Sequence, residues 1–205
     1  MRQIKEYITE RLNISSKLKI DYNYYPRTKK ELQDILKKLL DERGPNADLN
    51  DIDVSKIKDM HSLFNYIDCE LKNIDISKWD VSNCEDMDSM FFGCNEFNSD
   101  LSQWDVSNVR NMYGMFYYCE KFNSDLSQWD VSNVENMGAM FSCCKKFNSD
   151  LSHWDVSNVS DMNNMFRECI EFDQNLDNWK VNKVKSFKNM FYDCNIKKKP
   201  KWYKN

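Results

Sequence analysis

The sequence predicts an α/β protein, an open solenoid of strand–short-helix repeats with an N-terminal helical cap. Three observations lead to this fold class. A tryptophan returns every 25 residues, a Met-Phe pair follows each tryptophan at a constant distance, and an amphipathic segment precedes the first repeat. The phrase DLSQWDVSNV occurs unchanged at 100–109 and 125–134, and with one substitution at 150–159. Because a fixed period of this length is typical of solenoids, we assign residues 48–195 to one array of about six repeats.

The residues before the array predict two elements. Residues 1–25 predict a short helix and then a strand, because apolar residues first recur at helical spacing and then alternate in KLKIDYNYY. Residues 26–47 predict an amphipathic helix that starts with a capping box of Thr28 and Glu31 and ends at Gly44 and Pro45. Its apolar face suits the exposed end of a solenoid, which needs a cap with a polar outer side. Attachment to a membrane surface is the alternative interpretation.

Each repeat predicts one strand and one short helix. In LSQWDV, Trp104 and Val106 alternate with Gln103 and Asp105, which indicates a strand with its apolar residues inside. From Ser107, a typical N-cap residue, the apolar spacing becomes helical. That stripe consists of Val109, Met112, Met115, Phe116 and Cys119. We expect the stacked strands to form a parallel sheet and the Trp, Met and Phe rows to form one core.

The eight cysteines do not predict a metal centre. One cysteine falls in each repeat, from Cys69 to Cys194, and no C-x-x-C pair of the zinc-binding type is present. Free cysteine is among the most commonly buried residue types. We therefore expect a row of reduced, buried thiols, with no cofactor and no metal.

The repeat resembles a known family. The phrase FNSDLSQWDVSNVRNMYGMFYYC, and its copies between Asp48 and Cys194, resemble the BspA-like repeats, a relative of the leucine-rich repeats found in bacterial surface proteins. The resemblance implies a leucine-rich-repeat-like solenoid and a role in adhesion or host-protein binding. Surface-displayed members carry a signal peptide or an anchor, and this sequence shows neither.

The composition of the chain limits which classes of partner and which cellular locations we expect. A net charge of -4 and a pI of about 5.3 argue against nucleic acid as a partner, and we interpret residues 196–205 as a basic C-terminal tail. No run of about 18 apolar residues indicates a membrane span. The default location is therefore the cytoplasm, although the family resemblance allows a surface or secreted location by another route.

The sequence contains few histidines and no motifs of the kinds that enzymes use for catalysis. The two histidines, His61 and His153, lie in different repeats, and no phosphate loop or hydrolase motif is present. We therefore predict that the protein is not an enzyme. One row of acids, Asp80, Asp105, Asp130 and Asp155, has two interpretations. Each carboxylate could accept hydrogen bonds from nearby backbone N–H groups, or the row could hold a cation such as Ca²⁺.

Positions that vary between repeats are the candidate binding residues, because the scaffold does not require them. The first set lies on the expected sheet face, beside the acidic row, and consists of Lys78, Gln103, Gln128, His153 and Asn178. The second set follows each expected helix and includes Tyr113, Tyr117, Tyr118 and Tyr192. We predict a protein–protein interaction module whose partner is a protein of unknown identity. A structural, self-assembling protein and a cation-binding repeat protein are the alternatives.

Overall fold

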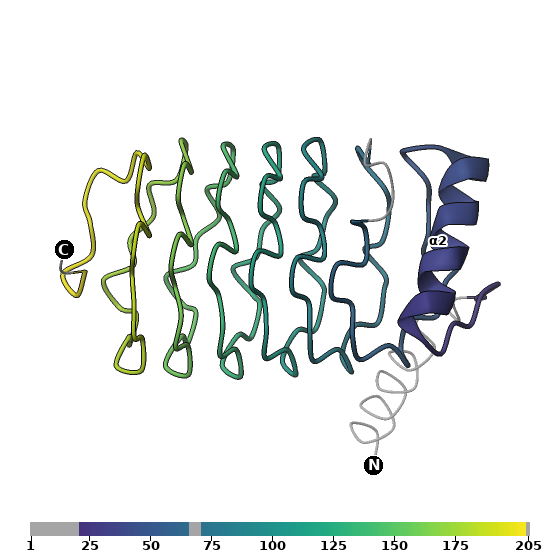
Figure 1. The fold of residues 1–205 in the computed structure, drawn as a ribbon, viewed down its shortest axis with the longest axis horizontal. Coiled ribbons are helices and arrows are strands. Elements are labelled where there is room, and N and C mark those ends of the chain that lie inside the picture. Colours follow the sequence, from purple (N-terminus) through teal and green to yellow (C-terminus); the bar gives the residue numbers. More distant parts are fainter. Residues whose placement is uncertain (1–20, 66–70, 204–205) are drawn as a thin grey trace, which may run out of the picture.

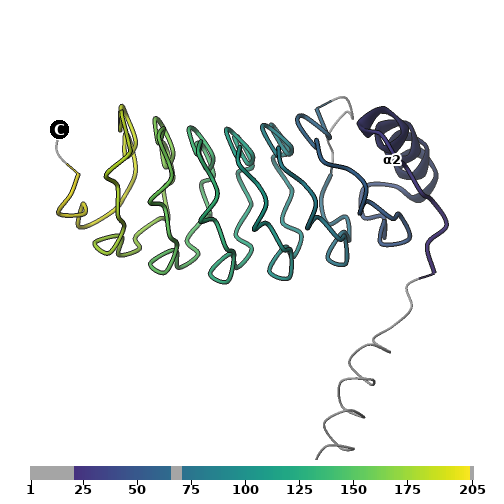
Figure 2. The same cartoon turned by 90° about the horizontal axis from the view of Figure 1, so that it is seen from below.

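The computed structural model describes residues 21–65 and 71–203, which form an elongated stack of coils (Figure 1). Helix α2 (Lys29–Arg43) lies at one end of the stack, and the C-terminal residues lie at the other. The view in Figure 2 shows the same order, so coils that are neighbours in sequence are also neighbours in space. One sequence repeat therefore corresponds to one coil.

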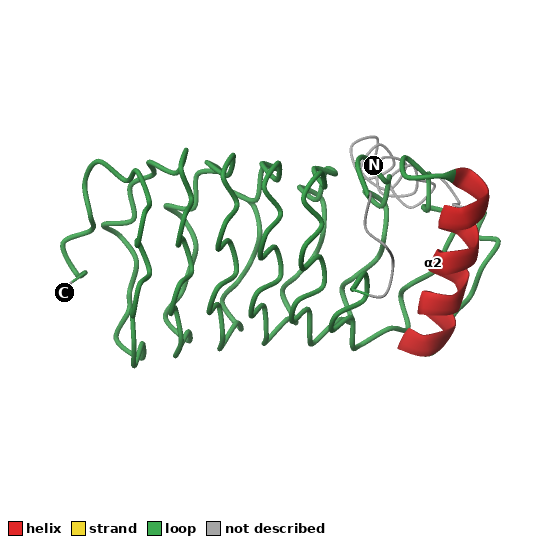
Figure 3. Cartoon of the chain, turned by 45° about the horizontal axis from the view of Figure 1, so that its top comes forward, coloured by secondary structure: helices red, strands yellow, loops and turns green. Residues whose placement is uncertain are grey.

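The predicted fold class, an α/β solenoid of leucine-rich-repeat-like strand–helix units, is wrong. Within the described ranges, α2 is the one helix and no strand is formed (Figure 3). Adjacent coils are joined instead by isolated parallel bridges. One series of bridges runs through Asp59, Asp86, Asn111, Asn136, Asp161 and Ser186. The repeats are therefore built from turns.

The segment predicted as a strand consists of two consecutive tight turns. The N–H of Trp104 donates to the carbonyl of Leu101 (3.1 Å), and the N–H of Val109 donates to the carbonyl of Val106 (2.9 Å). These are the closing hydrogen bonds of β-turns. The apolar residues still face inward, because the turns place Leu101, Trp104 and Val106 on the same side of the chain. Burial was predicted correctly here, but the backbone conformation was not.

The segments predicted as helices are instead the places where neighbouring coils bond most closely. We call residues 86–94, 111–119, 136–144, 161–169 and 186–194 the ladder segments. In each described pair, every second N–H of one ladder segment donates to a carbonyl of the next. The bonds from Met112, Gly114, Phe116 and Tyr118 to Asn136, Gly138, Met140 and Ser142 measure 2.8–3.0 Å. A helix would have consumed these groups internally, so the inter-coil ladder replaces it.

Two residues in each ladder segment have a positive φ angle, which a helix does not allow. In residues 111–119 they are Gly114 (φ 55°) and Tyr118 (φ 62°), and in the next coil they are Ala139 (φ 52°) and Cys143 (φ 63°). For a residue other than glycine, this left-handed conformation costs about 1–2 kcal/mol of conformational free energy. The inter-coil hydrogen bonds must therefore hold these residues in place.

Gly93 allows a test that separates the ladder from a helix. Its φ is 76°, and a Cβ built on it would meet no atom within 4 Å. We expect Gly93→Ala to lower the free energy of unfolding by about 1 kcal/mol through backbone strain alone. In a helix the same change would raise the free energy of unfolding by a similar amount. Urea unfolding therefore distinguishes the ladder from a helix by the sign of the change in this free energy. Gly93→Asn is the matched control and should cost less, because asparagine tolerates this region better.

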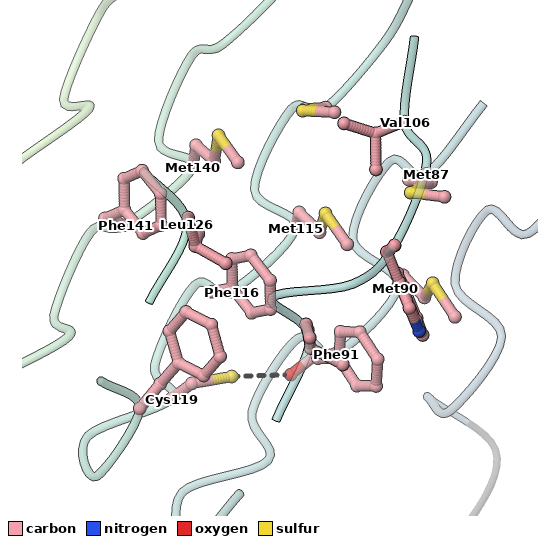
Figure 4. Close-up of a cluster of buried hydrophobic side chains, with 14 of the residues drawn as sticks. Met87, Met90, Phe91, Val106, Met115, Phe116, Cys119, Leu126, Met140 and Phe141 are labelled. Atoms are coloured by element: carbon pink, nitrogen blue, oxygen red, sulfur yellow. Dashed lines mark hydrogen bonds between the residues drawn. The ribbon is translucent and has the colours of Figure 1, made fainter. Parts of the chain in front are cut away.

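Rows of aromatic rings run along the core. Phe116 stacks on Phe91 and Phe141 of the neighbouring coils, with ring centroids 5.6 and 5.7 Å apart, and on Phe122 of its own coil at 3.9 Å. Figure 4 shows this row with Met115 and other methionines beside it. All of these side chains are fully buried. The prediction that the Met and Phe rows form the core is confirmed.

The tryptophans form a second row with a polar anchor. Trp104 stacks on Trp79 with centroids 6.3 Å apart, and its indole N–H donates to the carbonyl of Ile76 in the preceding coil (3.0 Å). The same bond to a preceding coil recurs for each tryptophan from Trp79 to Trp179. Each ring thus buries apolar area, and its indole N–H adds a second hydrogen bond to a carbonyl that already closes a turn, such as that of Ile76, which also accepts from the N–H of Trp79.

The described cysteines carry reduced thiols, and they form a third row. Cys119 donates to the carbonyl of Phe91 at 3.0 Å, which Figure 4 marks with a dashed line, and Cys144 donates to the carbonyl of Phe116 at 2.9 Å. Burial raises the pKa of the Cys84 thiol to about 12 and that of Cys144 well above its ordinary value. The prediction of a buried thiol row is confirmed for Cys84, Cys94, Cys119, Cys144 and Cys169, and Cys194 is half-buried. Cys69 lies outside the described residues.

Helix α2 closes the N-terminal end of the stack. The hydroxyl of Thr28 accepts a hydrogen bond from the N–H of Glu31 (3.2 Å), as a helix N-cap does, and Gly44 follows the last residue. Leu32, Leu36 and Leu39 are fully buried, while charged residues cover the outer side. Lys29 also donates to the carbonyl of His61 in the first coil (3.3 Å). The predicted amphipathic helix is therefore present and occupies the end of the core.

The C-terminal residues close the other end of the core. Trp202 stacks on Trp179 with centroids 6.2 Å apart, and its indole N–H donates to the carbonyl of Leu176 (2.7 Å). Lys197 pairs with Asp173 at 2.5 Å. Part of the segment interpreted as a basic tail is thus packed. Sequence reasoning missed Trp202 because it follows Trp179 by 23 residues, two short of the period.

Two remaining expectations concern the N-terminal extension and the membrane. The helix expected near the start, and the strand as far as Ile20, lie outside the described residues; Tyr24 forms an isolated bridge with Ile52. In residues 21–65 and 71–203, no helix combines the length and the apolar character that a bilayer crossing needs.

Candidate functional site

The first set of predicted binding residues lies on the turns, not on a sheet. We call this set and its acids the turn row, and all its members are exposed: Lys78, Gln103, Gln128, His153, Asn178, Asp80, Asp105, Asp130 and Asp155. Because each member occupies the same position in its coil, the row follows the long axis of the stack. The expected open sheet face does not exist in the described residues.

The carboxylates of the turn row stabilise their own turns. Asp105 accepts hydrogen bonds from the N–H and the hydroxyl of Ser107, at 3.0 and 2.6 Å. Asp80, Asp130 and Asp155 each accept from the N–H of the serine two residues later. Hydrogen bonds from the Ser157 hydroxyl and N–H lower the pKa of Asp155. This is the asparagine-and-aspartate turn chemistry that keeps such residues at fixed positions.

The acids of the turn row do not converge on a cation site. Successive carboxylates belong to successive coils, and each is directed to the serine of its own turn. Within the part of the chain that the structure describes, no three His, Cys, Asp or Glu side chains lie close enough together to hold a metal ion.

The second set of predicted residues includes a cluster of touching aromatic rings. Tyr117 and Tyr118 stack with centroids 4.5 Å apart, and Phe92 of the preceding coil meets them edge-on at 5.2 and 6.4 Å. Phe92 remains 39% exposed and Tyr118 remains 42% exposed. We call Phe92, Tyr117 and Tyr118 the aromatic patch. Burial, with a hydrogen bond to Tyr118, raises the pKa of Tyr117.

Two other tyrosines of this set lie outside the aromatic patch. Tyr192, 58% exposed, lies under the guanidinium of Arg167, whose centre is 5.4 Å from the ring centroid. Tyr113 is 41% exposed, and its ring lies so close to Gly138 that a Cβ there would come within 3.0 Å. One coil separates the aromatic patch from Arg167, and in that coil Ser142 and Cys143 are buried.

One polar constellation was not anticipated from the sequence. The Ser62 hydroxyl lies 3.3 Å from His61 Nε2, and His61 Nδ1 lies 3.8 Å from Asp88. The order of atoms is that of a hydrolytic triad, but the second distance exceeds a hydrogen bond. Asp88 also accepts a hydrogen bond from the Ser89 hydroxyl at 2.6 Å, and Ser62 is only 9% exposed. The geometry supports no nucleophile here, and the absence of enzyme activity stays a prediction.

The chain matches a family model described as a Mycoplasma protein of unknown function, DUF285, over residues 35–145 and 125–202. The protein belongs to this family. The two matches begin within α2 and end at Trp202, so the DUF285 model spans the coils and both ends of the core. No curated protein and no solved structure matches the chain. The DUF285 assignment itself carries no activity, and any function must come from the surfaces described above.

Proposed function

We propose that this DUF285 protein is a non-catalytic protein–protein interaction module and that the aromatic patch is its contact surface. The observation that carries the proposal is the packing of Phe92, Tyr117 and Tyr118 against one another while two of the three rings stay well exposed. Large aromatic side chains and arginine dominate the energies of protein interfaces. The resemblance to BspA-like repeats supports adhesion or host-protein binding as the class of function.

The comparison between coils favours the aromatic patch over the turn row. In the turn row, aspartate recurs at one position in four successive coils because the turns need it, and only one exposed position per coil varies freely. At the position of Tyr117, successive coils carry Phe92, Tyr117, Ser142, Arg167 and Tyr192. The ladder hydrogen bonds there use backbone groups, so the side chain is free to change.

The patch is also pre-organised. Ring contacts already fix Phe92 and Tyr117 in the free protein, so little side-chain freedom remains to be lost on binding. A rigid aromatic surface of this kind costs less to bury than the same rings on a mobile loop.

The test is partner capture with two matched variants. Phe92→Ser/Tyr118→Asn removes two rings of the patch, and asparagine suits the positive φ of 62° at position 118. Gln103→Glu/Gln128→Glu/His153→Glu alters the turn row at exposed positions. We expect wild type and the turn-row variant to retain the same partner, and the patch variant to lose at least about tenfold in affinity. Urea unfolding first establishes that all three proteins are folded.

Two other results would contradict the proposal. Loss of the partner by the turn-row variant alone would move the contact surface to the turns. If no protein partner is captured and all three proteins self-associate equally, a structural, self-assembling role would replace the interaction module.

A further inference from the structure

In the residues that the structure describes, the series of ladder bonds stops at an unpaired edge at the C-terminal end of the stack. Each ladder segment donates alternate N–H groups to the next one, and the last such bonds reach the carbonyls of residues 186, 188, 190 and 192. The matching donors of the last segment are the N–H groups of Phe187, Asn189, Phe191 and Asp193. In the described part of the chain none of these four has an acceptor. We call residues 185–193 the ladder edge.

The packed C-terminal residues cover the core but not this edge. Tyr203 contacts the ring of Phe191 at 5.1 Å, and Trp202 contacts the ring of Phe187 at 5.4 Å. Neither forms a hydrogen bond to the ladder edge. A hollow remains beside it, bordered by Lys185, Lys188, Lys199, Phe187, Tyr192 and Tyr203.

Charge along the stack indicates what would fit the hollow. At the register of Lys185, successive coils carry Lys58, Glu85, Arg110, Glu135 and Ser160. Opposite charges pair between neighbours, as in Lys58–Glu85 (2.7 Å) and Arg110–Glu135 (3.3 Å). Cross-coil pairs of opposite charge stabilise neighbouring segments, and like charges destabilise them.

Lys185, Lys188 and Lys199 have no acidic partner in the described residues, and no acid lines the hollow. The segment that would complete this register therefore carries acidic residues opposite the lysines.

We propose that the ladder edge binds an acidic segment of a partner protein. The segment adds to the stack in parallel, as a further ladder segment would, and its carbonyls accept the four free N–H groups. Addition of an extended chain to an exposed edge is a known mode of peptide recognition. A second copy of this chain cannot add head to tail in this way, because α2 covers the opposite end of its stack. The ladder edge is separate from the aromatic patch.

The chain itself supplies a probe of the right pattern. The peptide EDMDSMFFG copies Glu85–Gly93, which places an acid at the registers of both Lys185 and Lys188. Ser89 and Gly93, its two residues with positive φ, match the ladder conformation. The matched control is KDMKSMFFG, which keeps every apolar residue and reverses both charges.

Calorimetric titration and amide hydrogen exchange together test the proposal. We expect saturable binding of EDMDSMFFG and at least about tenfold weaker binding of KDMKSMFFG. Exchange should slow at Phe187, Asn189, Phe191 and Asp193. Lys185→Glu/Lys188→Glu should lower the affinity for EDMDSMFFG by at least about tenfold and raise the affinity for KDMKSMFFG. Lys72→Glu/Lys121→Glu, the same charge change at exposed lysines in other coils, should leave the affinity within about twofold.

Each other outcome overturns the proposal. Equal binding of the two peptides, or protection of amides elsewhere, would show that the ladder edge is not the site. Self-association that Lys185→Glu/Lys188→Glu abolishes would assign the edge to a second copy. Because the aromatic patch is intact in these variants, failure here leaves the proposed function unaffected.

Discussion

Replacing Trp104 with alanine is expected to lower the free energy of unfolding by about 3–5 kcal/mol, the usual cost of truncating a buried aromatic residue. Trp104 is 4% exposed, stacks on Trp79 and contacts the ring of Phe91 at 6.3 Å. The change also removes the indole N–H bond to the carbonyl of Ile76, which keeps only its hydrogen bond from the N–H of Trp79 (3.1 Å). Urea unfolding followed by circular dichroism measures the loss.

Gln103, the neighbouring residue, provides the control. Its side chain is exposed and bonds only the hydroxyl of Ser102, at 3.3 Å. Gln103→Lys should therefore change the free energy of unfolding by no more than about 0.5 kcal/mol. If Gln103→Lys is the more damaging change, or Trp104→Ala is neutral, the inward tryptophan row is incorrect.

The sequence was sufficient to predict burial but not backbone conformation. Met112, Met115, Phe116 and Cys119 recur at three- and four-residue steps, which is the spacing of a helix. Consecutive turns closed by hydrogen bonds to the third preceding residue, such as Met115 to Met112 (3.3 Å) and Cys119 to Phe116 (2.9 Å), produce the same spacing. A hydrophobic pattern alone cannot distinguish them. The positive φ angle at Tyr118 could not be foreseen, because tyrosine rarely adopts it.

The candidate sites depended on neighbours that the repeat does not reveal. The sequence identified Tyr117 and Tyr118 as exposed and variable, but the contact with Phe92 depends on how two coils align. Likewise, Lys185 and Lys188 look like ordinary surface lysines in the sequence. Their significance comes from the four unpaired N–H groups beside them, which result from the direction of the ladder bonds. Periodicity predicts what repeats, whereas these surfaces arise where the repeat changes or stops.

The buried thiols predict a loss of stability in alkali. Burial raises the pKa of Cys144 and Cys169 well above 9.0, that of Cys84 to about 12 and that of Cys194 to about 11. An unfolded chain releases its thiol protons near pH 9, whereas the folded chain retains them. The contribution of each thiol is therefore fully present below about pH 9 and is lost as the pH rises toward the folded pKa. In that window each thiol should lower the free energy of unfolding by about 1.4 kcal/mol per pH unit.

Cys144→Ser isolates one thiol from the other groups that titrate in alkali. Serine keeps a donor for the carbonyl of Phe116 but does not ionise in this range, so the slope of stability against pH should become shallower by about 1.4 kcal/mol per unit above pH 9. Met140→Leu, at another fully buried site, should shift stability equally at every pH and leave the slope unchanged. Lysine and tyrosine titrations are common to all three proteins and cancel in the differences. Parallel curves for wild type and Cys144→Ser would contradict the prediction. They would mean that the Cys144 thiol has the same pKa in the folded and the unfolded chain.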